Sequence, residues 1–113
     1  MSDKEIWWAG GSLDDLRNFP DDARRLAGHQ LHRVQLGLNP GDWRPVRRVG
    51  PGVVEIRVHA EVEHRVFYVA TFSERIYVLH TFQKKTQQTA QREFELGRRR
   101  FMEVLRWRRE QEL

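Results

Sequence analysis

Residues 53–82 read VVEIRVHAEVEHRVFYVATFSERIYVLHTF, and this stretch decides the fold. In residues 53–59, apolar side chains alternate with Glu, Arg and His, which is typical of a strand with one buried face. Two further apolar runs follow after short polar connections, at residues 65–72 and 76–82. Because short polar segments between such runs are typical of hairpin connections, the stretch predicts a three-stranded antiparallel meander.

The residues before the meander predict a short strand and two helices. Residues 5–9 have the aromatic and β-branched content of a strand. A helix is expected to begin at Ser12, with Asp15 three residues later in a capping-box arrangement. A second helix follows from Pro20, with apolar residues at helical spacing, and ends at Gly37. The two helices should form a hairpin whose apolar stripe covers one face of the sheet.

A final helix is predicted over residues 90–109, because apolar residues recur there on one stripe with arginines around the rest. Residues 37–45 are expected to be a loop. The sequence therefore predicts an α+β fold in which an N-terminal strand joins the meander in a mainly antiparallel four-stranded sheet. The helical hairpin packs on this sheet, and residues 1–113 form a single domain.

Composition narrows the class of protein. With 113 residues and 39% hydrophobic content, the chain is long enough for one globular core. It has no cysteine, which fits a reducing compartment. No apolar run approaches the ~20 residues of a membrane-spanning helix, and the start MSDKEIWW is unlike a signal peptide. We therefore expect a soluble cytoplasmic protein without a membrane partner.

The net positive charge of the chain lies in its C-terminal part. Residues 1–83 contain 11 lysines and arginines against 11 acidic residues, whereas residues 84–113 contain 9 against 5. This excess favours a polyanionic partner such as RNA, DNA or a ribosome. The alternative is that the arginines only form the solvated face of an amphipathic helix.

A basic cluster is predicted on the sheet face opposite the hairpin. By alternation, Glu55, Arg57 and His59 point to this face, and Arg65 should lie beside them. Lys84 and Lys85 follow the last strand directly, in a segment that lacks the usual turn residues. Phe67 and Val69 would share the face with Arg65, so either the final helix or a partner protein must cover this apolar surface.

Three segments in this order carry a family resemblance: Glu-Ile-Arg at residues 55–57, Arg-Val-Phe-Tyr-Val at residues 65–69, and IYVLHTFQKKTQQT at residues 76–89. Over residues 7–101 the chain resembles the RelE/ParE superfamily of toxins in type II toxin-antitoxin systems, and within it the HigB-like, phage-derived branch. The resemblance implies a RelE-like fold and a ribosome-dependent mRNA endonuclease, or mRNA interferase, that inhibits translation. It also implies a helix-turn-helix antitoxin, with operator DNA bound only through that antitoxin.

The resemblance places the basic residues of the active face at Arg57, Arg65 and Lys84 or Lys85. Many relatives also carry a catalytic tyrosine in or just before the final helix, but here Phe94 is the only aromatic residue in residues 90–99.

Metal-independent RNA cleavage suggests a role for each candidate. The 2′-hydroxyl attacks the adjacent phosphorus, so Arg57 and Arg65 are expected to hold the phosphate. Lys84 or Lys85, with a pKa lowered by neighbouring cations, is the predicted base, and His80 or His59 a possible acid. No cofactor or metal is expected. Further RNA contacts are assigned to exposed arginines, namely Arg47, Arg48, Arg98 and Arg99.

Structural alternatives remain for several of these residues. Arg57 could simply pair with Glu55 on the same strand face. His80 could be a hydrogen-bonded core residue, on one face with Ile76, Val78 and Phe82. At the level of function, the alternatives are a toxin of this fold that inhibits a protein such as DNA gyrase, or a non-catalytic RNA- or ribosome-binding module.

Overall fold

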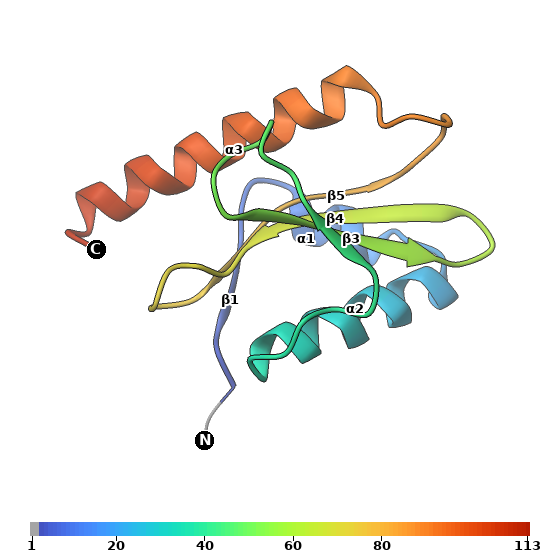
Figure 1. The fold of residues 1–113 in the computed structure, drawn as a ribbon, viewed down its shortest axis with the longest axis horizontal. Helices are drawn as coiled ribbons and strands as arrows, with labels where there is room; N and C mark the ends of the chain where they lie inside the picture. Colours follow the sequence, from blue (N-terminus) through green and yellow to red (C-terminus); the bar gives the residue numbers. More distant parts are fainter. Residues whose placement is uncertain (1–2) are drawn as a thin grey trace.

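The computed structural model describes residues 3–113 as a five-stranded mixed sheet with helices on both faces (Figure 1). The first two residues of the predicted domain, Met1 and Ser2, lie outside the described residues. The elements in chain order are β1 (Ile6–Trp8), α1 (Ser12–Arg17), α2 (Asp21–Gln35), β2 (Trp43–Pro45), β3 (Val53–His59), β4 (Glu63–Val69), β5 (Ile76–Gln83) and α3 (Gln91–Glu110).

The sheet has the strand order β1-β5-β4-β3-β2. The predicted antiparallel meander is confirmed by the pairing of β3 with β4 and of β4 with β5, whereas β1 pairs with β5 in parallel. The predicted number of four strands is wrong, because β2 adds a fifth strand antiparallel to β3 within the expected loop of residues 37–45. This strand is only three residues long, exposed throughout and ends in proline, so it has no apolar alternation to reveal it.

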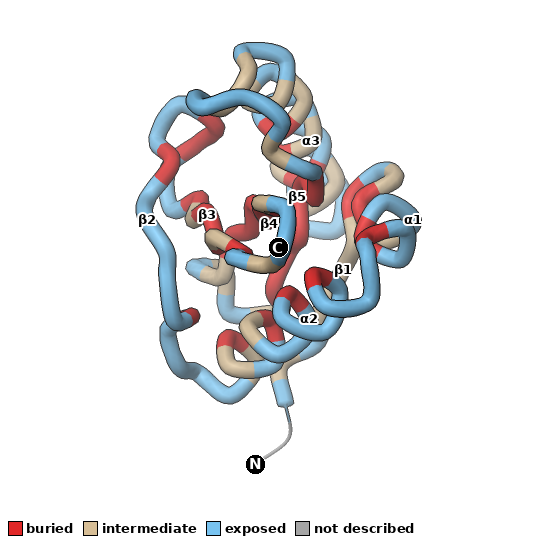
Figure 2. Tube along the Cα trace, turned by 90° about the vertical axis from the view of Figure 1, so that its right-hand side faces the viewer, coloured by how far each residue is buried: buried red, intermediate tan, exposed pale blue. Residues whose placement is uncertain are grey.

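Two apolar layers enclose the sheet. Figure 2 shows buried residues along the strands and on parts of α1, α2 and α3. On one face, Ala27 and Leu31 of α2 pack against Ile56 and Val66. This agrees with the prediction that the helical hairpin covers one face of the sheet. On the other face, α3 covers an apolar region that includes Phe67, Val69, Leu79, Phe101 and Val104. The final helix therefore covers the apolar surface next to Arg65, one of the two possibilities that the sequence left open.

A β-bulge in β5 changes which side chains share a face. Phe67 pairs with His80 while the next residue, Tyr68, pairs with Val78, which leaves Leu79 as an extra residue. Because the bulge reverses the alternation, His80 stacks on Phe82 on the α3 side of the sheet. The prediction that His80 shares a face with Ile76 and Val78 is therefore wrong.

The start of α1 also differs from its prediction. Gly11 is the N-cap residue, with no side-chain capping bond, so the expected capping box of Ser12 and Asp15 is wrong. Ser12 is fully buried instead, and its hydroxyl donates a hydrogen bond of 3.3 Å to the carbonyl of Val78. The Thr81 hydroxyl donates to the Ser12 carbonyl at 2.7 Å. Ser12 therefore docks α1 on β5, because burial of a hydroxyl requires hydrogen-bond partners.

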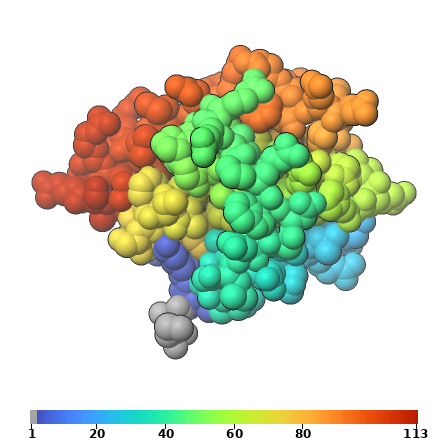
Figure 3. All heavy atoms as spheres, in the orientation of Figure 1, coloured from blue at the N-terminus to red at the C-terminus, as the bar shows by residue number. Residues whose placement is uncertain are grey.

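The segment between α2 and β3 crosses the front of the molecule from α2 to α3, where it is drawn in teal to green (Figure 3). It contains β2 and forms one wall of the site described below. Among residues 3–113, no helix combines the length and the apolar character needed to cross a membrane.

Candidate functional site

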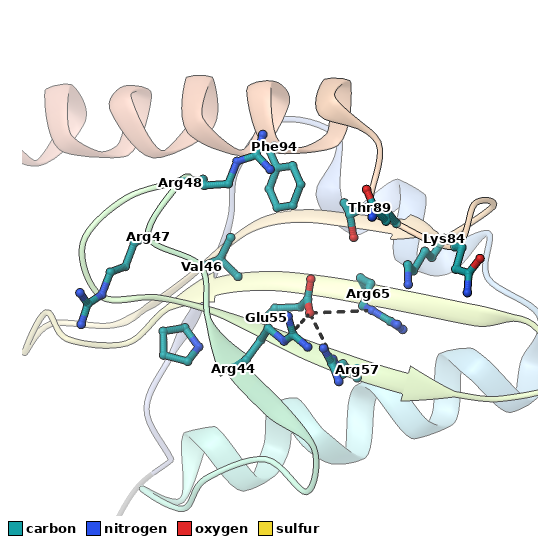
Figure 4. Close-up of a pocket in the computed structure, with 13 residues that line it drawn as sticks. Arg44, Val46, Arg47, Arg48, Glu55, Arg57, Arg65, Lys84, Thr89 and Phe94 are labelled. Atoms are coloured by element: carbon teal, nitrogen blue, oxygen red, sulfur yellow. Dashed lines mark hydrogen bonds and ion pairs between the residues drawn. The ribbon is translucent and has the colours of Figure 1, made fainter.

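A pocket of about 870 Å³ opens between the segment that contains β2, the strands β3 and β4, and the chain between β5 and α3 (Figure 4). Its charged lining consists of one acid and six cations: Glu55, Arg44, Arg47, Arg48, Arg57, Arg65 and Lys84. The remaining lining residues are Pro45, Val46, Gln87, Gln88, Thr89 and Phe94. The pocket therefore has a strong excess of positive charge, which suits an anionic ligand.

Strand register brings the charged side chains together. Glu55 on β3 lies opposite Arg44 on β2, and Arg57 on β3 lies opposite Arg65 on β4. Two arginines directly opposite each other repel, so this arrangement needs a nearby negative charge. Glu55, two residues before Arg57 on the same face of β3, supplies that charge.

Glu55 lies at the centre of the basic cluster and is only 5% exposed. Its Oε1 atom accepts a hydrogen bond from Arg57 Nε at 3.4 Å and lies 3.9 Å from the Nε atoms of Arg44 and Arg65. The predicted pairing of Arg57 with Glu55 is therefore present, but as one part of a cluster in which three guanidinium groups surround a single carboxylate (Figure 4).

Burial raises the pKa of the Glu55 carboxyl, although the positive charges of Arg65, Arg44 and Lys84 act in the opposite direction. A raised pKa at a group inside a pocket is a common property of functional sites.

The arginines of the cluster differ in their freedom. Arg65 is buried, and its Nη1 donates hydrogen bonds of 2.9 Å to Glu63 Oε1 and to the His64 carbonyl. The side chain of Arg57 is 28% exposed and that of Arg44 is 58% exposed. Arg65 is thus a fixed charge in the wall, while the other two can reach a ligand.

Of the two adjacent lysines, only Lys84 lines the basic pocket. Lys84 lines the basic pocket, and its backbone N–H donates to the Glu63 carbonyl at 2.8 Å, which continues the pairing of β5 with β4. Lys85 lines a second pocket, which lies between α1 and the first turn of α3 and is also lined by His80. Both lysines also line a small cavity next to the start of α3, so what distinguishes them is that only Lys84 lines the basic pocket.

His80 connects β5 to α3. It is 4% exposed, and its Nε2 lies 3.0 Å from Glu93 Oε1 on the first turn of α3. Burial lowers the pKa of His80, against the influence of Glu93. Its position corresponds to the predicted core histidine, and it is not among the residues that line the basic pocket.

Comparison with protein families gives one match that covers most of the chain. The family described as Phage derived protein Gp49-like (DUF891) matches residues 14–102. The chain belongs to this Gp49-like family. Every residue that lines the basic pocket of the Gp49-like chain falls within the matched segment, whereas β1 lies before it. No curated protein gives a significant match.

The family agrees with the coarser part of the resemblance stated from the sequence. Gp49-like proteins are RelE-like and associated with toxin-antitoxin systems, and the family implies an antitoxin as partner. The narrower assignment to the HigB-like branch stays a prediction.

Of the four predicted RNA-binding arginines, three lie in or beside the basic pocket and one does not. Arg47 and Arg48 line the pocket of the Gp49-like chain, and Arg98 lies beside them, since its Nη1 donates to the Arg48 carbonyl at 3.3 Å. Arg99 is exposed on α3 and is not part of the pocket lining.

His59, the other possible acid, lies outside the pocket lining. Its Nε2 is 2.5 Å from Asp42 Oδ2, and its Nδ1 is 2.9 Å from both Glu63 carboxylate oxygens. These hydrogen bonds, first to Asp42 and then to Glu63, raise the pKa of His59 against the effect of burial. His59 therefore ties the chain before β2 to the hairpin between β3 and β4.

Two members of the site were missed from the sequence. Glu55 was considered only as a partner of Arg57, although its place between apolar residues on a buried strand could have indicated a buried acid. Arg44 lies in a segment that gave no strand signal, so only the pairing of β2 with β3 brings it to the site. Within residues 3–113, no group of three or more His, Cys, Asp or Glu side chains is arranged to hold a metal ion.

Proposed function

We propose that this Gp49-like protein is the toxin of a type II toxin-antitoxin pair and cleaves mRNA on the ribosome as an endoribonuclease. The observation that carries this proposal is the pocket lined by six cationic side chains, three of which surround one buried carboxylate. A phosphodiester fits such a pocket because each phosphate adds a negative charge that arginine can bind through two N–H groups.

The proposed reaction needs no group beyond the substrate and the chain. The 2′-oxygen of one nucleotide attacks the adjacent phosphorus, the bond from phosphorus to the 5′-oxygen breaks, and a 2′,3′-cyclic phosphate and a 5′-hydroxyl form. The attacking oxygen loses a proton, and the leaving oxygen gains one. Arg57 binds the phosphorane and stabilises its extra negative charge, and Arg65 contributes a positive charge that is fixed in the wall before the substrate binds.

We assign the role of proton acceptor to Glu55 and that of proton donor to Lys84. A carboxylate accepts a proton directly, and the raised pKa of Glu55 makes it a stronger base than an exposed carboxylate. An amine must first lose a proton before it can act as a base, whereas an ammonium group can protonate the leaving oxygen. This assignment differs from the sequence-based prediction, in which Lys84 or Lys85 was the base.

The pocket also favours RNA cleavage over the main alternative. A toxin that inhibits a protein such as DNA gyrase without catalysis has no need of a convergent cluster of arginines around a buried acid. The antitoxin implied by the family would neutralise the toxin by covering this pocket or by blocking entry to the ribosome.

The adjacent lysines provide a matched test. The wild-type protein and the variants Lys84→Ala and Lys85→Ala are induced in growing bacteria without antitoxin, and new mRNA ends are mapped. The wild type should cut within translated frames. Cleavage by Lys84→Ala should be about 10²- to 10⁴-fold slower than that by the wild type, because the variant lacks the proposed proton donor. Lys85→Ala should remain active because its side chain lines the other pocket.

Two further measurements complete the test. Circular dichroism should show that both variants fold, since surface lysines away from the core contribute little to stability. Purified protein should cut a message only when ribosomes are present. Equal activity of the two lysine variants would refute the assigned site. Growth arrest with intact messages would instead support a protein target or a binding role.

A further inference from the structure

Three planar groups form a stack in the wall of the basic pocket next to α3. Phe67 is fully buried, and the ring of Phe94 stacks on it at a centroid distance of 6.0 Å and an interplanar angle of 16°. The guanidinium carbon of Arg48 lies 4.0 Å from the centroid of Phe94. Figure 4 shows Arg48 and Phe94 side by side beneath α3, with Glu55 and its arginines across the pocket.

Arg48 is held in this position by two further contacts. Its Nη2 donates a hydrogen bond to Gln91 Oε1 on the first turn of α3, and its own carbonyl accepts one from Arg98 Nη1 at 3.3 Å. Arg47 lines the same pocket, but its side chain makes no hydrogen bond or ion pair with another residue in the described range 3–113. The two neighbouring arginines therefore have the same charge and differ in orientation.

This orientation is unlike that of an arginine used only to bind phosphate. Phosphate is bound through the N–H edge of a guanidinium, and part of the Arg48 edge is already occupied by Gln91. Its flat face lies along an aromatic ring instead. Arginine planes and aromatic rings are the surfaces on which proteins stack unpaired bases.

We propose that Arg48 and Phe94 form a stacking site for one unpaired nucleobase of the RNA strand, beside the arginines that hold the scissile phosphate. The proposal rests on the proposed function in that the ligand is an RNA strand. It adds that the base is recognised as well as the phosphate. Polar groups that can hydrogen-bond the edge of such a base line the same pocket, at Gln87, Gln88 and Thr89.

The test separates base binding from phosphate binding and from cleavage. Two fluorescently labelled strands of nine nucleotide units are compared by anisotropy, both with 2′-deoxy sugars so that neither can be cleaved. One strand carries bases, and the other has the same phosphates but an abasic sugar at every position. Titrations use the full chain as wild type, Arg48→Lys, Arg47→Lys and Phe94→Leu.

The wild type should bind the strand with bases about tenfold more tightly than the abasic strand, as expected for stacking of a base. Arg48→Lys keeps the positive charge but loses the planar guanidinium. The ratio of the two affinities should therefore fall towards one, while the affinity for the abasic strand is unchanged. Arg47→Lys should keep the wild-type preference. Phe94→Leu should reduce the preference as Arg48→Lys does, with thermal unfolding used to show that the variant is folded.

Equal affinity of the wild type for both strands would overturn the stacking site, as would an unchanged preference in Arg48→Lys. Binding of neither strand would overturn it as well, together with the assignment of the pocket to phosphodiesters. A base preference that depends on Arg48 in a protein that cleaves no message would support the stacking site while refuting the proposed catalysis. The two proposals can therefore fail separately.

Discussion

The ion pair between Glu74 and Arg108 should make the stability of the protein depend strongly on acid pH. Arg108, near the end of α3, donates hydrogen bonds to Glu74 Oε2 from Nε at 2.6 Å and to Oε1 from Nη2 at 3.2 Å. The Tyr77 hydroxyl donates to the same carboxylate at 2.6 Å. The side chains of Glu74 and Arg108 are only 14% and 17% exposed, so solvent screens this pair weakly.

The expected magnitude follows from the pKa of Glu74. The hydrogen bonds from Arg108 lower this pKa from its ordinary value of 4.5 to about 2, with a smaller contribution from Tyr77 and opposition from burial. At 1.36 kcal/mol per pKa unit, this difference corresponds to about 3 kcal/mol of folding free energy. Because the pKa is lower in the folded state, the contribution is complete above pH 4.5 and is lost as the pH falls towards 2.

Urea unfolding, followed by tryptophan fluorescence between pH 7 and pH 2, measures this contribution. Glu74→Gln should lower the free energy of unfolding by up to about 3 kcal/mol at pH 7, and its difference from the wild type should disappear near pH 2. Glu103→Gln, on the exposed side of α3, should change stability by less than about 0.5 kcal/mol. A difference for Glu74→Gln that is absent at pH 7, or that persists unchanged to pH 2, would refute the reasoning.

Three further predictions concern the site and the sheet. Glu55→Gln should lower cleavage about 10²- to 10⁴-fold and remove the acidic limb of its pH profile, and an unchanged profile would exclude Glu55 as the base. Gly97→Ala should destabilise the protein by about 1 kcal/mol in thermal unfolding, because the new Cβ would lie 2.9 Å from a ring carbon of the buried β4 phenylalanine. The control Gly28→Ala has no atom within 4 Å of the new Cβ and should stabilise α2 by up to about 1 kcal/mol. Asp42→Asn should lower the pKa of His59 in an NMR titration, since the hydrogen bond with Asp42 is the main cause of its rise, and an unchanged pKa would contradict this contact. Because that pKa is raised on folding, the stabilisation from His59 is present at low pH and lost as the pH rises through it.

Local sequence patterns determined most of the secondary structure. The alternation in residues 53–59 gave β3 with its observed bounds, and the helical spacing before Gly37 gave α2. The same alternation placed Glu55, Arg57 and Arg65 on one face of the sheet, where they are found. These features follow from backbone periodicity, which acts over a few residues and can be read from the chain itself.

Other features depended on contacts between distant segments. The bulge at Leu79 moved His80 to the α3 side of the sheet, and the pairing of β2 with β3 brought Arg44 to Glu55. Packing of the segment before β3 against α3 placed Arg48 over Phe94.

The sequence by itself determined the strands, the helices and the charged face of the sheet, because each depends on the spacing of neighbouring residues. It showed two lysines after the last strand but not which one belongs to the site. Only the tertiary structure showed that Lys84 lines the basic pocket and that Lys85 lines a second pocket instead. The physical reason is that a pocket exists only where walls from separate segments meet, and the burial of Glu55 among three arginines requires all of them to be in place.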